Sequence, residues 1–211
     1  MLNLKKENSL FAAGITLVAG LDEAGRGPLA GPVVAAAVTL KPEMVEKFFA
    51  VKELKNIKDS KLLPEKKREE LFEIIKNNFF EIGVGVCDHE TIDRINIYQA
   101  TFLAMKKAIG ALKTKPDYVM LDGRAPIPNL SLRQENIING DAFVLSIAAA
   151  SIIAKVTHDR LIAELAAQYP QYGFLNHKGY GTKEHLEALK KYGPSPIHRK
   201  TFGPVKELLK N

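Results

Sequence analysis

The sequence is poor in cysteine, tryptophan and long apolar runs. Its 211 residues include one cysteine, Cys87, and no tryptophan. A single cysteine excludes an intrachain disulfide and a cysteine-rich zinc site, and it favours a reducing compartment. The longest apolar stretch, residues 143–154, contains two serines and is shorter than the ~20 residues that a membrane span requires. We therefore expect a protein of the cytoplasm.

The N-terminal segment has the order of a secretory signal without its other features. Lys5 and Lys6 precede an apolar stretch, residues 10–21, as in a signal peptide. No convincing cleavage site follows, and the stretch continues directly into Asp22 and Glu23. We interpret it as a β-strand.

Basic residues outnumber acidic residues by 30 to 24, which gives a net charge of +6 and a pI of about 9.2. This balance favours a polyanionic partner such as nucleic acid, although many other enzymes have a similar pI. With 46% hydrophobic and 26% charged residues, the composition is that of a soluble globular protein. It excludes disorder, collagen and a coiled coil as the main architecture. No internal repeat or flexible linker divides the chain.

Hydrophobic patterning predicts alternating strands and helices. The predicted strands are residues 15–21, 33–40, 79–86, 118–121 and 134–138. The predicted helices are residues 64–78, 89–112 with a break near Asn96, 141–169, 183–192 and 204–210. This order indicates an α/β fold with a mixed sheet. We expect a core over residues 1–170 and a helical appendage over residues 171–211, packed together as one structural unit.

Two acids, Asp22 and Glu23, directly follow the first predicted strand. Burying carboxylates is costly, so the simple alternative is a strand end that reaches solvent. Neighbouring strand residues point to opposite faces, and the two acids can therefore share a site only at the end of the strand. Gly25, Arg26 and Gly27 come next, a combination that allows close backbone approach and phosphate binding. The segment matches neither a Walker A loop nor a dinucleotide fingerprint.

Two further acids follow predicted strands. Asp122 ends the strand at residues 118–121, where α/β sheets place their ligands; the alternative is a simple Asp-Gly turn. Asp141 begins a long predicted helix, where it is either a site residue or an N-cap. Asp159 lies 18 residues further along this helix, roughly 27 Å away, so a salt bridge with nearby basic residues suits it better. The five histidines lack zinc-type spacing, and a set made only of carboxylates suits Mg²⁺ or Mn²⁺.

Several motifs together resemble ribonuclease HII, the bacterial type 2 ribonuclease H. The opening motif is DEAGRGPLAGPV, residues 22–33, and the helix motif is SIAAASIIAKVTHDR, residues 146–160. The other matching segments are residues 59–61, 121–123, 140–141, 169–182 and 193–199. The resemblance covers residues 14–205 in order and without a large insertion.

The resemblance implies a role for each matching site residue. The family's catalytic, metal-binding carboxylates fall on Asp22, Glu23, Asp122 and Asp141, which would hold two divalent cations, Mg²⁺ or Mn²⁺. The residues that would contact substrate are Gly25, Arg26 and Gly27 at the ribonucleotide, Tyr180 beside it, and Ser60 and Lys61 at a backbone phosphate. A packing role is the alternative for Tyr180.

The resemblance also implies a fold and an activity. The fold would be a ribonuclease H-like five-stranded mixed sheet flanked by helices, with a C-terminal helical portion. The enzyme, a monomer, would cut RNA–DNA hybrids and duplex DNA containing single ribonucleotides. Cleavage 5′ to the ribonucleotide would leave 3′-hydroxyl and 5′-phosphate ends. The competing interpretations are a nucleic-acid-binding module without activity and a two-carboxylate glycosidase, which the absence of tryptophan disfavours.

Overall fold

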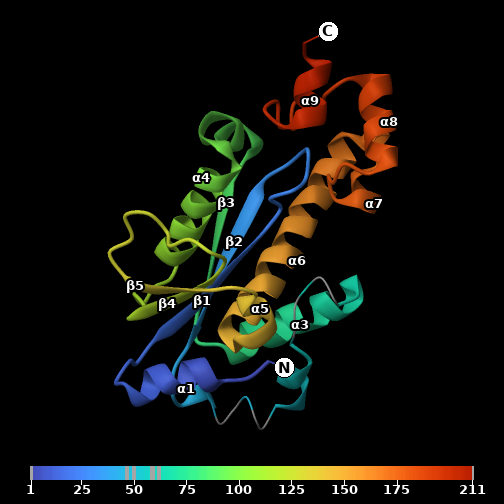
Figure 1. Ribbon diagram of the computed structural model, residues 1–211. Helices are drawn as coiled ribbons and strands as arrows, with labels where there is room; N and C mark the ends of the chain where they lie inside the picture. Colours follow the sequence, from blue (N-terminus) through green and yellow to red (C-terminus); the bar gives the residue numbers. More distant parts are fainter. Residues whose placement is uncertain (1, 46–47, 49–50, 58–59, 61–62, 211) are drawn as a thin grey trace.

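The computed structural model describes residues 2–45, 48, 51–57, 60 and 63–210. Five strands form one mixed sheet in the order β3-β2-β1-β4-β5 (Figure 1). They are β1 (Val18–Ala24), β2 (Val33–Leu40), β3 (Ile82–Cys87), β4 (Tyr118–Asp122) and β5 (Arg133–Ile137). β2 is antiparallel to β1 and β3, whereas β1, β4 and β5 run parallel. The carboxyl ends of β1, β4 and β5 therefore meet at one edge of the sheet.

Helices cover both faces of the sheet. The α-helices are α1 (Lys5–Ala12), α3 (Glu65–Asn78), α4 (His89–Gly110), α5 (Gly140–Phe143), α6 (Leu145–Gln168), α7 (Phe174–His177), α8 (Lys183–Tyr192) and α9 (Gly203–Leu208). Among the described residues there are also two 3₁₀ turns, η1 (Lys52–Asn56) and η3 (Pro170–Tyr172). In Figure 1, α4 lies on one side of the sheet, and α6 with α3 lies on the other.

The core has two layers because successive strand residues point to opposite faces. Val18 and Met120 pack in the cluster that includes α6 and α3. Their strand neighbours Ala19 and Val119 pack with α4. The expected α/β fold with a five-stranded mixed sheet is confirmed.

A glycine in β1 lets α6 approach the sheet closely. A Cβ atom at Gly20 would lie 2.2 Å from the Ser146 carbonyl carbon, so only glycine fits at this point. The facing helix is rich in alanine and buried along most of its length. The sequence predicts such a helix close to the sheet, and the structure confirms it.

The C-terminal segments form a third cluster at one end of the molecule (Figure 1). Phe174 and Leu189 pack there against Leu29 and Ala30 and against Ile162 of α6. The division into a core of residues 1–170 and an appendage of residues 171–211 stays a prediction. In the part of the chain that the structure describes, no helix is long and apolar enough to cross a membrane.

Several expected boundaries were wrong, and one expected break was correct. The strand predicted over residues 15–21 runs from Val18 to Ala24, and residues 10–12, interpreted as part of an apolar strand, belong to α1. The third strand begins at Ile82, three residues later than expected. The helix expected over residues 141–169 is two helices, separated at Val144 by an extended backbone with φ −110° and ψ 122°. The break expected near Asn96 is confirmed, with φ 65° inside α4.

Candidate active site

The four candidate acids lie at the edge where the parallel strands end. Asp22 and Glu23 lie near the carboxyl end of β1, and Asp122 is the last residue of β4. Leu21 pairs with Leu121 in the parallel register, which places Asp22 beside Asp122. An Asp122 carboxylate oxygen accepts a hydrogen bond of 2.8 Å from the Gly140 amide, so the residue before Asp141 contacts Asp122.

Asp141 is not the N-cap that the sequence left open. The N-cap of α5 is Asn139, which has a left-handed backbone with φ 56°. Asp141 lies one residue inside the helix and is buried. The simple N-cap alternative is therefore wrong, and the site role stays a prediction.

Asp22 is a buried carboxyl in an unfavourable electrostatic position. Burial raises its pKa well above the usual range, and the charges of Glu23 and Asp122 raise it further. Hydrogen bonds from the Ser151 hydroxyl and from the Glu23 amide at 2.7 Å oppose this shift without cancelling it. Three carboxyl groups thus lie close enough for their charges to interact.

Ser60 reaches this site through another hydroxyl. The Ser60 and Ser151 hydroxyl oxygens are 2.9 Å apart and buried. Either hydroxyl can donate in this pair, and the Ser151 hydroxyl also bonds Asp22. The expected phosphate contact of Ser60 stays a prediction, and Lys61 lies outside the described residues.

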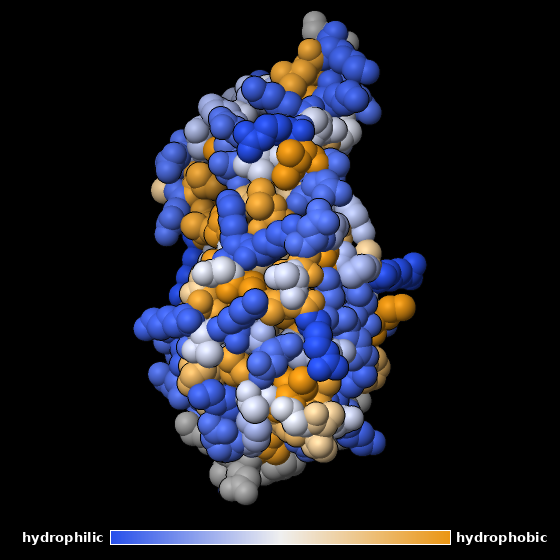
Figure 2. All heavy atoms as spheres, turned by 90° about the vertical axis from the view of Figure 1, so that its left-hand side faces the viewer, coloured by the Kyte–Doolittle hydropathy of each residue, from blue (hydrophilic) through white to orange (hydrophobic). Residues whose placement is uncertain are grey.

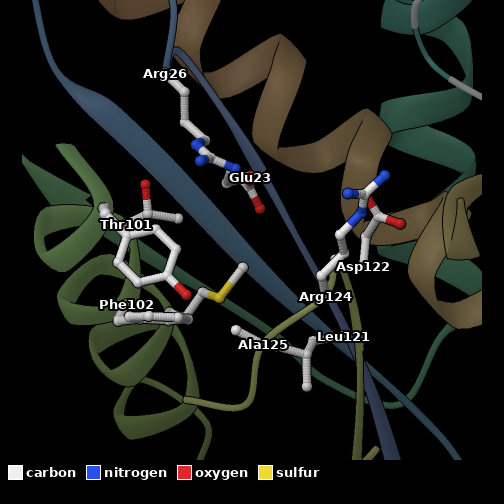
Figure 3. Close-up of a pocket in the computed structure, with 11 residues that line it drawn as sticks. Glu23, Arg26, Thr101, Phe102, Leu121, Asp122, Arg124 and Ala125 are labelled. Atoms are coloured by element: carbon white, nitrogen blue, oxygen red, sulfur yellow. Dashed lines mark hydrogen bonds and ion pairs between the residues drawn. The ribbon is translucent and has the colours of Figure 1, made fainter. Parts of the chain in front are cut away.

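Glu23 follows Asp22 in β1 and takes the other face of the strand, yet its charge is close enough to raise the pKa of Asp22. It lines a pocket of about 340 Å³ whose other wall includes Thr101 and Phe102 of α4 (Figure 3). Its carboxylate accepts a hydrogen bond of 2.9 Å from the Arg26 guanidinium. As the side chains stand, no three acidic, histidine or cysteine residues among those described are grouped to hold a metal ion.

The pocket opens on the face that carries α4. Figure 2 shows this face, where hydrophobic and hydrophilic side chains alternate across the middle of the molecule. Arg26 and Arg124 line the pocket together with Glu23 and Asp122 (Figure 3). Both charge types are therefore present where an anionic substrate would meet the acids.

The turn after β1 lies against two ring side chains. Gly25 has φ +88°, and a Cβ atom there would lie 2.4 Å from the His158 ring. A Cβ atom on Gly27 would lie 3.1 Å from the Tyr180 ring. Tyr180 is 42% exposed, so its ring borders the turn while remaining open to a ligand. The structure thus brings together the two segments expected to contact the ribonucleotide.

Asp159 forms the expected salt bridge. Its carboxylate lies 2.7 Å from Lys155 Nζ and 3.4 Å from the Arg68 guanidinium, and it accepts a hydrogen bond of 3.1 Å from His158 Nδ1. Burial would raise the pKa of Asp159, but the bonds to His158 and Lys155 outweigh it and hold the pKa below its usual value. Arg68 also donates to the Leu63 carbonyl at 2.6 Å, which links Asp159 to the segment after Ser60.

Two residues near the site were not identified from sequence. Ser151 lies inside the helix motif, and Arg199 ends the segment at residues 193–199, but neither pattern indicates a role. Arg199 is fully buried in the described structure. A basic residue after a histidine in a proline-containing segment gives no local signal that it is buried.

The comparisons with known proteins decide the family. A family model described as ribonuclease HII matches residues 19–205. The chain belongs to the ribonuclease HII family. It is 52% identical over 203 residues to a ribonuclease HII of Endomicrobium trichonymphae, covering 96% of this chain and 93% of that protein. It is 54% identical over 210 residues to a ribonuclease HII of Acholeplasma laidlawii, covering 99% and 98%.

Solved structures of the family have the same fold. A ribonuclease H2 from Pyrococcus horikoshii OT3 is 28% identical, with a TM-score of 0.73 and coverage of 92% of this chain and 97% of that chain. A ribonuclease HII from Archaeoglobus fulgidus, solved in complex with PCNA, is 28% identical with a TM-score of 0.73, covering 89% and 95%. As a ribonuclease HII, this chain is an endonuclease of the hydrolase class. The glycosidase and the inactive binding module are therefore set aside.

Proposed function

We propose that this ribonuclease HII is a metal-dependent endonuclease that cuts RNA–DNA hybrids and duplex DNA containing single ribonucleotides. Cleavage is on the 5′ side of the ribonucleotide and leaves 3′-hydroxyl and 5′-phosphate ends. The observation that carries the proposal is that Glu23 and Asp122 lie near buried Asp22 at the ends of parallel strands, where burial and their charges raise the pKa of Asp22. Membership of the ribonuclease HII family supports the same reaction.

The chemistry of the donor set fits divalent cations. Carboxylate oxygens are the ligands that Mg²⁺ and Mn²⁺ prefer. Like charges around a buried carboxyl are a state that a bound cation relieves. Two ions held by Asp22, Glu23, Asp122 and Asp141 would make a nucleophile of water at neutral pH and stabilise charge on the leaving oxygen.

The residues beside the acids have separate tasks in this proposal. The turn Gly25–Gly27 brings backbone atoms close to the ribose, where a contact to the 2′-hydroxyl distinguishes RNA from DNA. The Tyr180 ring stacks on the neighbouring sugar or base. Ser60 and Lys61 lie in the segment proposed to contact a backbone phosphate.

A defined duplex tests the proposal. Wild-type enzyme should cut a DNA duplex with one ribonucleotide only when Mg²⁺ or Mn²⁺ is present, and it should leave the all-DNA duplex intact. Asp122→Asn should reduce the single-turnover rate at least a hundredfold. Glu187→Gln, which changes an exposed acid of α8 far along the chain, is the matched control and should cut at the wild-type rate.

Two results would contradict this function. One is cleavage of the ribonucleotide duplex in excess chelator, and the other is near-wild-type turnover by folded Asp122→Asn.

We further propose that the enzyme works as a monomer in the cytoplasm. Light scattering coupled to size exclusion measures the oligomeric state directly.

A further inference from the structure

Arg199 is a fully buried cation whose guanidinium is bonded to backbone carbonyls. Nε donates to Gly31 O at 3.0 Å, and one terminal nitrogen donates to Arg26 O at 3.0 Å. The other terminal nitrogen donates to Gly25 O at 2.6 Å and to Pro32 O at 2.9 Å. Four N–H groups of one planar guanidinium thus donate to backbone carbonyls of one short segment.

This segment is the turn that connects β1 to β2. The carbonyls come from its two ends, residues 25–26 and residues 31–32, so the guanidinium ties both ends to one point. Gly25 and Gly31 have φ of +88° and +83°, a backbone that glycine adopts readily and that is entropically costly to fix. Arg199 therefore sets the position of the residues proposed to contact the ribose.

The same C-terminal segment is bonded to the loop that carries Tyr180. The Arg199 amide donates to Leu29 O at 2.8 Å, and the Leu29 amide donates to Gly179 O at 2.8 Å. Ala30 and His198 form an antiparallel bridge. Three chain segments, around residues 25–32, 177–180 and 195–199, are thereby joined side by side.

A chain of hydrogen bonds through two buried histidines continues to Tyr180. His185 Nδ1 lies 2.9 Å from the Tyr180 carbonyl and must donate to it. His198 Nδ1 accepts from the Ser195 amide at 2.9 Å, so its proton is on Nε2. The two Nε2 atoms are 2.9 Å apart, and His198 therefore donates to His185.

Backbone groups at both ends fix the direction of every bond in this chain. Both imidazoles must be neutral for it to hold, and burial together with the neighbouring His185 lowers the pKa of His198 to about 4. Burial also lowers the pKa of His185. The histidine pair is therefore a rigid connection at neutral pH, because protonating either ring would place two donors against each other.

We propose that His198 and Arg199 are positioning residues that hold the Gly25–Gly27 turn and Tyr180 in one fixed arrangement, through which the enzyme senses the 2′-hydroxyl. Arg199 acts on the turn, and His198 acts on Tyr180 through His185. This inference rests on the proposed cleavage of ribonucleotide-containing duplexes. It adds two residues that touch neither the acids nor the ligand.

The test compares two substrates that differ at one 2′ group. One duplex carries a single ribonucleotide, and the other carries 2′-deoxy-2′-fluoro at the same position. We define the 2′ factor as the single-turnover rate on the ribonucleotide duplex divided by the rate on the fluoro duplex, both at saturating enzyme. Arg199→Lys keeps a positive charge but cannot reach four carbonyls, and it should reduce the 2′ factor at least tenfold. His198→Asn keeps an acceptor for Ser195 and loses the bond to His185, and it should reduce the factor about threefold to tenfold.

Arg133→Lys is the matched control, because it makes the same exchange on the edge strand β5, at the end away from the acids. It should keep the wild-type 2′ factor. A purely structural role would lower the melting temperature and the folded fraction but leave the 2′ factor of the folded enzyme unchanged. An unchanged 2′ factor in folded Arg199→Lys or folded His198→Asn overturns the inference. If Arg199→Lys does not fold, His198→Asn decides alone. A wild-type enzyme that cuts neither duplex would instead refute the proposed function.

Discussion

Replacing Gly20 by alanine should separate α6 from the sheet and damage the site at the same time. The new Cβ atom would lie 2.2 Å from the Ser146 carbonyl carbon and 2.4 Å from the Ile147 amide nitrogen. The obstacle is helix backbone, which cannot rotate away as a side chain can. The contact must open by about 1.2 Å to reach an ordinary separation of 3.4 Å.

The expected cost can be set from this overlap. Overpacking in a close-packed core costs about 1–3 kcal/mol, and we expect the upper end because α6 must move as a unit. For a chain of this size that corresponds to a melting temperature lower by roughly 6–12 °C. Because Gly20 is two residues before Asp22 and Ser146 is five after Asp141, the single-turnover rate should fall as well.

Gly110→Ala is the matched control for Gly20→Ala. Gly110 is the last residue of α4, and a Cβ atom there would meet nothing within 4 Å. Alanine at this helical position should stabilise the protein by about 0.5 kcal/mol. Urea unfolding of both variants measures the difference. A Gly20→Ala variant within about 0.5 kcal/mol of wild type would refute the close approach of α6.

Three further predictions concern buried carboxyl groups. Because the folded-state pKa of Asp22 is raised, its contribution to stability is lost as pH rises through that pKa. In chelator at pH 8, Asp22→Asn should therefore melt at a higher temperature than wild type, and with Mg²⁺ or Mn²⁺ added it should not cleave the ribonucleotide duplex. Burial likewise raises the pKa of Glu7, and urea unfolding should show wild type losing stability relative to Glu7→Gln between pH 4 and pH 8. Asp159→Asn should lose about 3 kcal/mol of stability yet keep its rate per folded molecule. Asp141→Asn should lose the rate, and equal kcat losses in both would show that the wrong aspartate was chosen.

Local sequence patterns predicted the correct bounds of elements whose limits depend only on nearby residues. β2 (Val33–Leu40) and α8 (Lys183–Tyr192) have the predicted bounds. β2 is an unbroken apolar run between turn residues, and α8 begins after Thr182, whose hydroxyl accepts from the His185 amide. Neither element depends on a distant partner for its limits.

The errors at the N-terminus and at Val144 have one tertiary cause. The Asn3 amide donates to Phe143 O at 3.2 Å, and Asn3 bridges to Val144, which holds the extended break between α5 and α6. Glu7 accepts from the Ser146 amide and hydroxyl, each at 3.0 Å, so α1 caps the start of α6. A contact between residues about 140 positions apart leaves no periodic signal in the sequence.

The same limit applies to the site. Acids after strands could be identified because carboxyl groups are out of place in apolar runs, and the resemblance to the family then suggested metal binding as their chemistry. The neighbours of each acid could not be predicted: Asp22 lies beside Ser151 of α6, whereas Glu23 bonds Arg26 and lines the pocket beside α4. These different surroundings follow from β1 continuing to Ala24 instead of ending at Leu21, because both acids then lie within the strand.

One helix connects most of these parts. α6 packs its first turn on Gly20, supplies the Ser151 hydroxyl to Asp22, and places the His158 ring beneath Gly25. The next residue, Asp159, forms an ion pair with Arg68, and the Arg68 guanidinium donates to the Leu63 carbonyl after Ser60. These positions are five to seven residues apart along one helix, so they follow its length from the acids to the turn between β1 and β2. Small side chains along α6 therefore do more than fill the core, because they let the helix lie close to the sheet between the acids and this turn.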